Sequence, residues 1–358
     1  MPSTYIIAEA GVNHNGSSKR ALALVDMAAD AGADAVKFQT FLAELGCSRN
    51  APKASYQVET TGQTESQLDM VKKLELDYSA HKLLKQRCKE RNIHFLSTPF
   101  DAPSVDLLVR DIEVPLLKIA SGEITNAPLL LYVAQTNLPV IFSTGMSLLG
   151  DIELGLGVLA YGYLRSQAPP SIAEFQRAYQ SMEGQKILQE KVTLLLCTTE
   201  YPTPFSDVNL RAMDTLAAAF GLPVGLSDHT LGYTVAVAAA ARGAAVVEKH
   251  VTLDRDLPGP DHQASLEPAE LAAMVKAIRE VDLALGSPRK LLAPCEVDNQ
   301  RIARKSLVAR QAIRKGELFS DQNLGIKRPG TGIPGMRYWE FLDTKATRDY
   351  DIDELIQP

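Results

Sequence analysis

Three of the six histidines fall in one stretch, Gly225 to His262, and two of them end apolar runs. His229 closes PVGLSDH and His250 closes AAVVEKH, with one alanine-rich helical segment between the two runs. Consecutive parallel strands joined by a single helix usually lie side by side, so we expect both imidazoles to face one space. Two neutral imidazoles suit a divalent metal with open coordination positions, although two unrelated, hydrogen-bonded histidines could have the same spacing.

The elements that would position these histidines recur along the first 286 residues. Eight apolar runs each end in polar side chains and are followed by a helical segment. The runs lie at residues 5–11, 33–40, 93–101, 115–123, 138–146, 191–202, 223–229 and 244–250. Eight such units predict a closed (β/α)8 TIM barrel, an α/β fold, over an open doubly wound sheet. Closure would bring the last strand beside the first, so we expect Glu9 to lie near His250.

Three segments depart from this repeat. Residues 41–76 are long and polar, which is typical of a functional loop. Residues 148–190 indicate an extended helical excursion broken at Pro169 and Pro170. After the barrel, which we expect to span 1–286, a linker at 287–300 leads to a small, mainly β domain at 301–358. That domain is near the lower size limit for folding alone, so we expect it to pack on a partner surface.

Composition excludes several classes of protein. The chain has 358 residues, of which 46% are hydrophobic and 22% charged, as in ordinary globular proteins. Its net charge of -6 argues against a general nucleic-acid or anionic-membrane surface. The four cysteines, at positions 47, 88, 197 and 295, form no CxxC pair and favour reduced thiols. With no signal-peptide pattern and no bilayer-length apolar run, we expect a cytoplasmic protein.

An ordered set of motifs over nearly the whole chain resembles the sialic acid (N-acetylneuraminate) synthase family. The motifs are IIAEAGVNHNG, AVKFQT, LSTPFD, KIASGE, STGM, CTTEYPTP, GLSDHT, EKH, LPGPDH, IRKGE and KRPGTG. The resemblance implies a synthase that joins phosphoenolpyruvate (PEP) to an N-acetylated hexose, forms a nine-carbon 2-keto sugar acid and releases phosphate. It further implies a TIM barrel with a C-terminal antifreeze-like (SAF) domain, a domain-swapped homodimer and a divalent metal. We expect Mn²⁺ first, with Mg²⁺, Co²⁺, Zn²⁺ or Fe²⁺ as alternatives.

The resemblance assigns roles to residues at the predicted barrel mouth. PEP would contact five residues: Lys37, Lys118, Ser121, Ser143 and Ser227. Point charges on two lysines suit the carboxylate and phosphate of such an anion, with hydroxyl groups completing the contacts. His229 and His250 match the metal ligands. Glu9 matches the acid/base carboxylate, which would take a proton from the attacking water.

The acceptor sugar would contact a second set of residues. The resemblance assigns this role to Gln39, Glu123, Tyr201, Asp261 and Arg328. Arg328 lies in IKRPGTG and would reach the barrel mouth of the other subunit. Thr199 departs from the family pattern, since some relatives carry Asn there. His14 and His262 are expected to be structural or to support the residues that touch substrate.

The sequence leaves the acceptor sugar open. N-acetylmannosamine, our first expectation, would give N-acetylneuraminate, and a diacetamido-trideoxy hexose would give a legionaminate- or pseudaminate-type acid. A Schiff-base aldolase that makes the same class of product, with Lys37 or Lys118 as nucleophile, is a more distant alternative. A further alternative is an ice- or glycan-binding protein that binds through its C-terminal domain. Such a protein would not need polar residues at the ends of eight strands.

Overall fold

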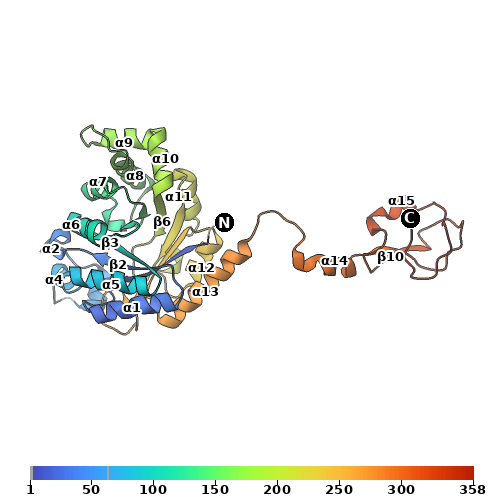
Figure 1. Cartoon of the computed structure of the whole chain (residues 1–358), viewed down its shortest axis with the longest axis horizontal. Helices are drawn as coiled ribbons and strands as arrows, with labels where there is room; N and C mark the ends of the chain where they lie inside the picture. Colours follow the sequence, from blue (N-terminus) through green and yellow to red (C-terminus); the bar gives the residue numbers. More distant parts are fainter. Residues whose placement is uncertain (1–2, 63) are drawn as a thin grey trace. The chain divides into compact units, whose positions relative to one another are not determined.

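The computed structural model describes residues 3–62 and 64–358 and divides the chain into two compact units. The first extends to Gly286 and the second covers Ser287–Pro358. Eight parallel strands form the centre of the first unit, with helices around them (Figure 1). The strands are β1 (Tyr5–Gly11), β2 (Ala35–Thr40), β3 (His94–Pro99), β4 (Leu117–Ile119), β5 (Val140–Ser143), β6 (Val192–Cys197), β7 (Val224–Asp228) and β8 (Val246–His250).

The strands close into the predicted TIM barrel. Their order is β3-β2-β1-β8-β7-β6-β5-β4, and contacts between β3 and β4 complete the circle. β1 pairs with β8 so that Glu9 lies opposite His250, as the closed barrel requires. The main helices of this unit are α1 (Ser18–Asp30), α5 (Tyr78–Glu90), α6 (Ala102–Asp106), α7 (Ala127–Gln135), α8 (Leu149–Tyr163), α9 (Ile172–Gln180), α10 (Met182–Lys191), α11 (Ala212–Phe220), α12 (Thr234–Ala241) and α13 (Pro268–Leu285).

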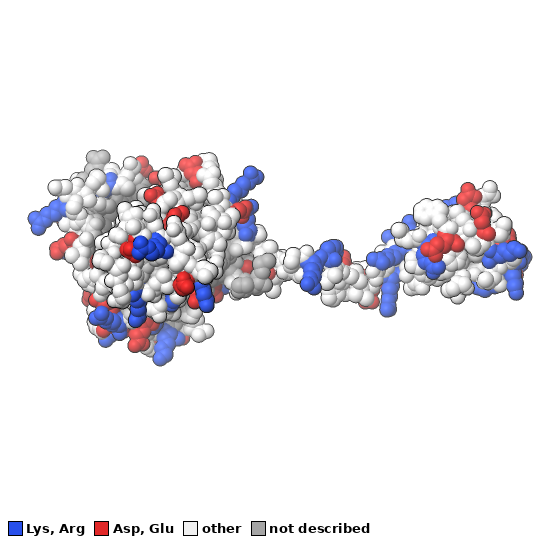
Figure 2. Space-filling model, turned by 90° about the horizontal axis from the view of Figure 1, so that it is seen from above, with Lys and Arg blue, Asp and Glu red and all other residues white. Residues whose placement is uncertain are grey.

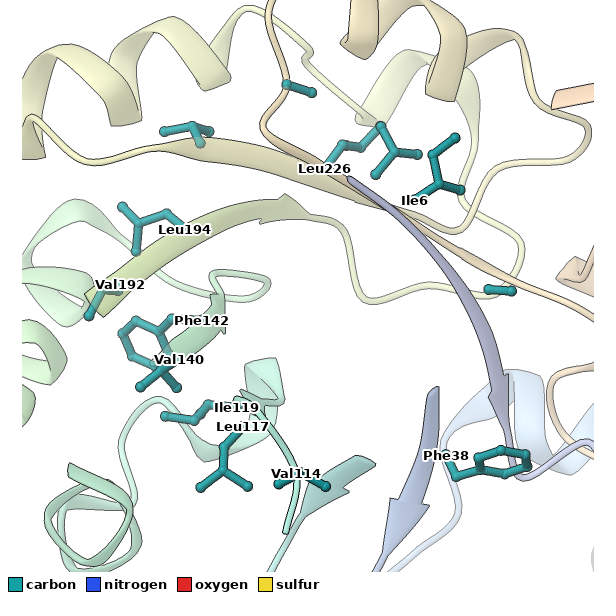
Figure 3. Close-up of a cluster of buried hydrophobic side chains, with 14 of the residues drawn as sticks. Ile6, Phe38, Val114, Leu117, Ile119, Val140, Phe142, Val192, Leu194 and Leu226 are labelled. Carbon is teal, nitrogen blue, oxygen red and sulfur yellow. The ribbon is translucent and has the colours of Figure 1, made fainter. Parts of the chain in front are cut away.

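The strands are buried on both faces, which explains their nearly continuous apolar runs. Alternate side chains point outward and pack against the helices, among them Ile6, Phe38 and Leu194 (Figure 3). The inward-pointing set forms a small separate cluster: Ile7, Ala35, Leu96, Ile141, Leu195 and Val246. Because side chains alternate along a strand, the next inward position is two residues further on. The inner face therefore changes from apolar residues to polar ones toward the carboxyl ends of the strands.

The long segment after β2 is more ordered than a loop. It contains α2 (Ala43–Gly46), α3 (Ser55–Thr61) and α4 (Gln67–Lys72). Local capping explains part of the difference, because the Ser66 side chain accepts a hydrogen bond from the backbone N–H of Asp69 at the start of α4. The excursion between β5 and β6 is helical, as predicted, and consists of α8, α9 and α10.

The second unit has a small core and little regular structure. β9 (Ser306–Ala309) and β10 (Leu324–Lys327) form an antiparallel pair, and α15 (Tyr338–Phe341) follows. The core residues are Leu307, Ala309, Ile313, Phe319, Leu324, Ile333, Ala346, Tyr350 and Ile356. The segment expected to be a linker ends in a helix, because α14 (Val297–Ala303) begins within it. A short 3-10 turn, Pro294–Glu296, precedes this helix, and Glu296 caps the turn by accepting a hydrogen bond from the N–H of Ala293.

The surface carries charges of both signs. On the face that Figure 2 shows, basic and acidic side chains are interspersed, in keeping with the small net charge. Within residues 3–62 and 64–358, no helix combines the length and the apolar character needed to cross a membrane.

Candidate active site

Four buried side chains at the strand ends form a charged cluster: Glu9, Lys37, Lys118 and Glu248. Lys37 Nζ lies 2.6 Å from Glu9 Oε2 and 3.5 Å from Glu248 Oε2. Lys118 Nζ lies 3.4 Å from Glu248 Oε1, which also accepts a hydrogen bond from Ser227 Oγ at 2.9 Å. The two lysines predicted to bind PEP thus share one carboxylate, which offsets the repulsion between two buried cations.

The two carboxyl groups of the charged cluster differ in acidity. Burial raises the pKa of Glu9 to about 7, against the opposing effect of Lys37 and with the help of the negative charge on Glu248. Burial also acts to raise the pKa of Glu248, but Lys118 and Lys37 outweigh it and lower that pKa to about 2. Glu248 therefore stays ionised while Glu9 titrates near neutral pH. Such a split suits Glu9 to accept and return a proton.

His229 and His250 face each other with their ring centroids 5.2 Å apart. His229 Nδ1 donates to the backbone oxygen of Thr198 at 2.7 Å, so Nε2 carries the lone pair when this ring is neutral. Although burial opposes it, Cys197 and this hydrogen bond raise the pKa of His229. Among the residues that the structure describes, buried His250 Nδ1 has no hydrogen-bond partner. Burial, together with His229 and Lys37, lowers the pKa of His250 well below its usual value, which keeps this imidazole neutral.

In their neutral forms, these two imidazoles have the chemistry of metal ligands, since a metal binds neutral nitrogen lone pairs. No group of three or more His, Cys, Asp or Glu side chains in the described part of the chain could hold a metal ion. A metal bound by His229 and His250 would therefore complete its coordination with substrate or water. The metal remains a prediction.

The three serines predicted to contact PEP lie at the same end of the barrel. Ser227 bonds to Glu248, and Ser121 Oγ accepts a hydrogen bond from the N–H of Gly145 at 3.0 Å. Ser143 Oγ is buried and has no partner within the described residues. A Cβ on Gly145 would lie 2.7 Å from Ser121 Oγ, so only glycine brings this amide so close. These hydroxyl groups and the amide supply hydrogen-bonding groups beside the lysines.

A cavity of about 220 Å³, here called the loop-lined pocket, contains four of the five residues predicted to bind the sugar. Its lining consists of Val12, Gln39, Phe41, Leu42, Ala43, Gly46, Cys47, Tyr56, Gln57, Met70, Val71, Leu74, Phe100, Glu123, Tyr201, Pro260 and Asp261. A row of rings joins it to the histidines, because Tyr56 packs on Tyr201 at 5.1 Å and Tyr201 packs on His229 at 4.1 Å between centroids. The pocket therefore opens beside the candidate metal ligands.

The remaining predicted residues lie elsewhere. Arg328 belongs to the second unit, where it is exposed and donates from Nε to the backbone oxygen of Ala303 at 3.1 Å. Its contact with a sugar stays a prediction. His14 and His262 are buried, and burial lowers the pKa of each to about 4. His262 lies 2.7 Å from Thr252 Oγ1, which fits a structural role.

Sequence reasoning missed Glu248 and Tyr56. Glu248 precedes His250 by two residues, so strand alternation alone puts both on the inner face of the barrel. That signal was present in EKH. Tyr56 comes from α3, and its approach to Tyr201 depends on how the segment between β2 and α5 folds. No spacing in the sequence reports that contact.

Comparison with known proteins identifies the family. A family model described as the NeuB family matches residues 24–290. The chain is 51% identical over its whole length to the whole N,N'-diacetyllegionaminic acid synthase of Campylobacter jejuni. It is 42% identical to the Legionella pneumophila protein of that name, over 92% of this chain and 86% of that one. A solved N-acetylneuraminic acid synthetase from Leptospira borgpetersenii aligns with a TM-score of 0.65 at 33% identity, over 83% of this chain and 90% of that one. The chain therefore belongs to the NeuB family and is an enzyme of the nonulosonic acid synthase class.

Proposed function

We propose that this enzyme is an N,N'-diacetyllegionaminic acid synthase, which condenses PEP with a diacetamido-trideoxy hexose. The main support for this proposal is the 51% sequence identity, over both full chains, to a relative of that name. The solved N-acetylneuraminic acid synthetase is 33% identical. These values favour the diacetamido sugar over N-acetylmannosamine, which the sequence analysis put first.

The charged cluster and the loop-lined pocket support separate roles in this reaction, the first for PEP and proton transfer and the second for the sugar. Lys37 and Lys118 hold the anionic groups of PEP, and the serine hydroxyls orient them. Carbon 3 of PEP forms a bond to the aldehyde carbon of the sugar, water adds to carbon 2, and phosphate leaves. Glu9 takes the proton from that water. The products are one nine-carbon 2-keto acid and one phosphate.

His229 and His250 are the residues that would hold a divalent metal. Bound there, such an ion would polarise the aldehyde oxygen of the sugar. We propose Mn²⁺, with Mg²⁺, Co²⁺, Zn²⁺ or Fe²⁺ as alternatives. Metal content and phosphate release are measured after chelation and after each ion is returned. Full activity in metal-free protein, or in the variant with both histidines changed to Ala, contradicts this part of the proposal.

A Schiff-base aldolase requires an unprotonated lysine. Although burial opposes it, Glu248 and Glu9 raise the pKa of Lys37, which keeps that amine protonated and a poor nucleophile. Burial lowers the pKa of Lys118, so this lysine is the one to test. Borohydride reduction in the presence of pyruvate is expected to trap no adduct at either lysine. A trapped adduct would favour the aldolase.

We further infer a cytoplasmic, domain-swapped homodimer in which the second unit, an antifreeze-like domain, brings Arg328 to the partner barrel. Its exposed guanidinium and the family resemblance support this reading. The test mixes chains carrying Arg328→Ala with chains carrying Glu9→Gln, each inactive alone. Recovery of activity in the mixed dimer is expected, because one pairing has an intact barrel and an intact arginine. No recovery in a verified mixed dimer contradicts the shared site.

The reaction itself is tested by phosphate release from PEP with a panel of acceptor sugars and by the mass of the acid formed. We expect release that depends on the 2,4-diacetamido-2,4,6-trideoxy hexose and an acid of the summed composition. Release without any acceptor, or with every sugar equally, contradicts the proposed function.

A further inference from the structure

We propose that one side of the loop-lined pocket is an apolar wall that selects the acceptor sugar by its methyl groups. The wall is built from six residues: Phe41, Leu42, Met70, Val71, Leu74 and Phe100. Five of them belong to the segment between β2 and α5, and Phe100 follows β3. This inference rests on the proposed function, because it concerns the acceptor of the same reaction.

The lining of the pocket includes two chemically distinct sets of residues. Gln39, Glu123 and Asp261 offer hydrogen-bonding groups, and Tyr201 packs on His229 at 4.1 Å. The apolar wall lines the same cavity from the segment after β2. A sugar with hydroxyl groups on every carbon would leave some of them against hydrocarbon, where they gain no hydrogen bonds.

The apolar wall is held in place by hydrogen bonds at its base. The N–H of Leu42 donates to Asp101 Oδ2 at 2.8 Å, and the N–H of Ala43 donates to Glu75 Oε1 at 2.6 Å. Phe41 and Phe100 pack edge to face with centroids 6.1 Å apart. These contacts tie the start of α2 to the segments that follow α4 and β3, which holds the wall in place.

The proposed acceptor carries two methyl groups that N-acetylmannosamine lacks. One belongs to the second acetamido group and the other is carbon 6 without its hydroxyl. A methylene-sized difference in an apolar pocket changes kcat/KM by about 10–200-fold. The wall therefore gives a physical reason for a synthase of this family to prefer the trideoxy sugar.

Leu42 and Leu45 provide a matched pair of variants on the same short helix region. Leu42 lines the pocket and is 46% exposed, whereas Leu45 is 60% exposed and falls outside the described lining. Leu42→Asn keeps a similar size and replaces hydrocarbon with an amide. We expect it to lower the ratio of kcat/KM for the diacetamido sugar over that for N-acetylmannosamine by about tenfold or more. Leu45→Asn is expected to leave the ratio unchanged, and both variants should keep the wild-type KM for PEP.

Val71→Thr is a second probe, since it keeps the side-chain shape and replaces one methyl group with a hydroxyl group. Where one sugar is not turned over, calorimetric Kd values for the two sugars give the corresponding ratio of affinities. An unchanged ratio in both Leu42→Asn and Val71→Thr, or an equal fall in Leu45→Asn, overturns the apolar wall. If the wild type prefers N-acetylmannosamine, the proposed function fails, but the change in ratio between wild type and variants still decides the role of the wall.

Discussion

The two sides of the barrel mouth are built in different ways. The charged cluster comes from strand ends held in parallel register, with β1 opposite β2 and β8. Its members are buried and bonded to one another. The loop-lined pocket depends on short helices between β2 and α5 and is neutral over its apolar wall. Under the proposed function, the strand ends would carry the groups for PEP and proton transfer, and the connecting segment would add an apolar wall to the polar residues predicted to contact the acceptor.

This division predicts that changes in the charged cluster alter turnover or stability, whereas changes in the pocket alter the choice of sugar. If the strand ends hold the reacting groups, the choice of acceptor sugar can change through the segment between β2 and α5 alone.

Glu9→Gln is expected to have the largest effect. An amide keeps the shape of the side chain but cannot accept the proton, and loss of a general base lowers kcat by about 10²–10⁴-fold. Calorimetry should still detect binding of PEP and of the acceptor. Near-native kcat in this variant would remove Glu9 from the mechanism.

Glu248→Gln is expected to destabilise the barrel. It leaves Lys37 and Lys118 buried without their shared carboxylate, and breaking a buried pair costs about 3–5 kcal/mol. PEP should raise the Tm of this variant more than that of the wild type, because the anion replaces the missing charge. Glu44→Gln is the control, since it breaks an exposed pair with Lys72 and should leave Tm unchanged. Equal Tm values for both variants would contradict the importance of the cluster.

The pH dependence of kcat/KM is expected to report Glu9. A base whose pKa is raised to about 7 is protonated below that pH, so the rate constant should fall tenfold for each unit of pH on the acid side. The negative charge of Glu248 helps to raise this pKa, so Glu248→Gln should move the acid limb to lower pH. A limb at the same pH in wild type and variant contradicts this coupling.

Tyr56→Phe is expected to have the smallest effect. It keeps the ring against Tyr201 and removes one hydroxyl group from the pocket. Loss of one hydrogen bond of about 0.5–1.5 kcal/mol corresponds to about a 2–10-fold rise in KM for the acceptor. The KM for PEP should not change. A rise in both KM values would show that the two sides of the mouth are not separable.

The contrast between the strand ends and the segment between β2 and α5 explains which residues the sequence could place. Alternation along a strand fixes which side chains face inward, so the amino-acid sequence alone could place Glu9, Lys37 and His250 at the barrel mouth. Glu248 obeys the same rule, and its place two residues before His250 was a signal that the sequence carried. Tyr56 and Leu42 could not be assigned, because their positions depend on the fold of a segment without repeating pattern. The role proposed for Arg328 would require assembly of two chains, which the pattern of one chain does not describe.

The most direct test of the central claim is a competition between two acceptors in one reaction. PEP, the 2,4-diacetamido-2,4,6-trideoxy hexose and N-acetylmannosamine are supplied with wild-type enzyme, the sugars at equal concentration, and the two acids are quantified by mass. Their ratio gives the ratio of kcat/KM values for the two sugars. We predict at least a tenfold excess of the legionaminate-type acid. Equal amounts, or an excess of N-acetylneuraminate, would contradict the proposed acceptor.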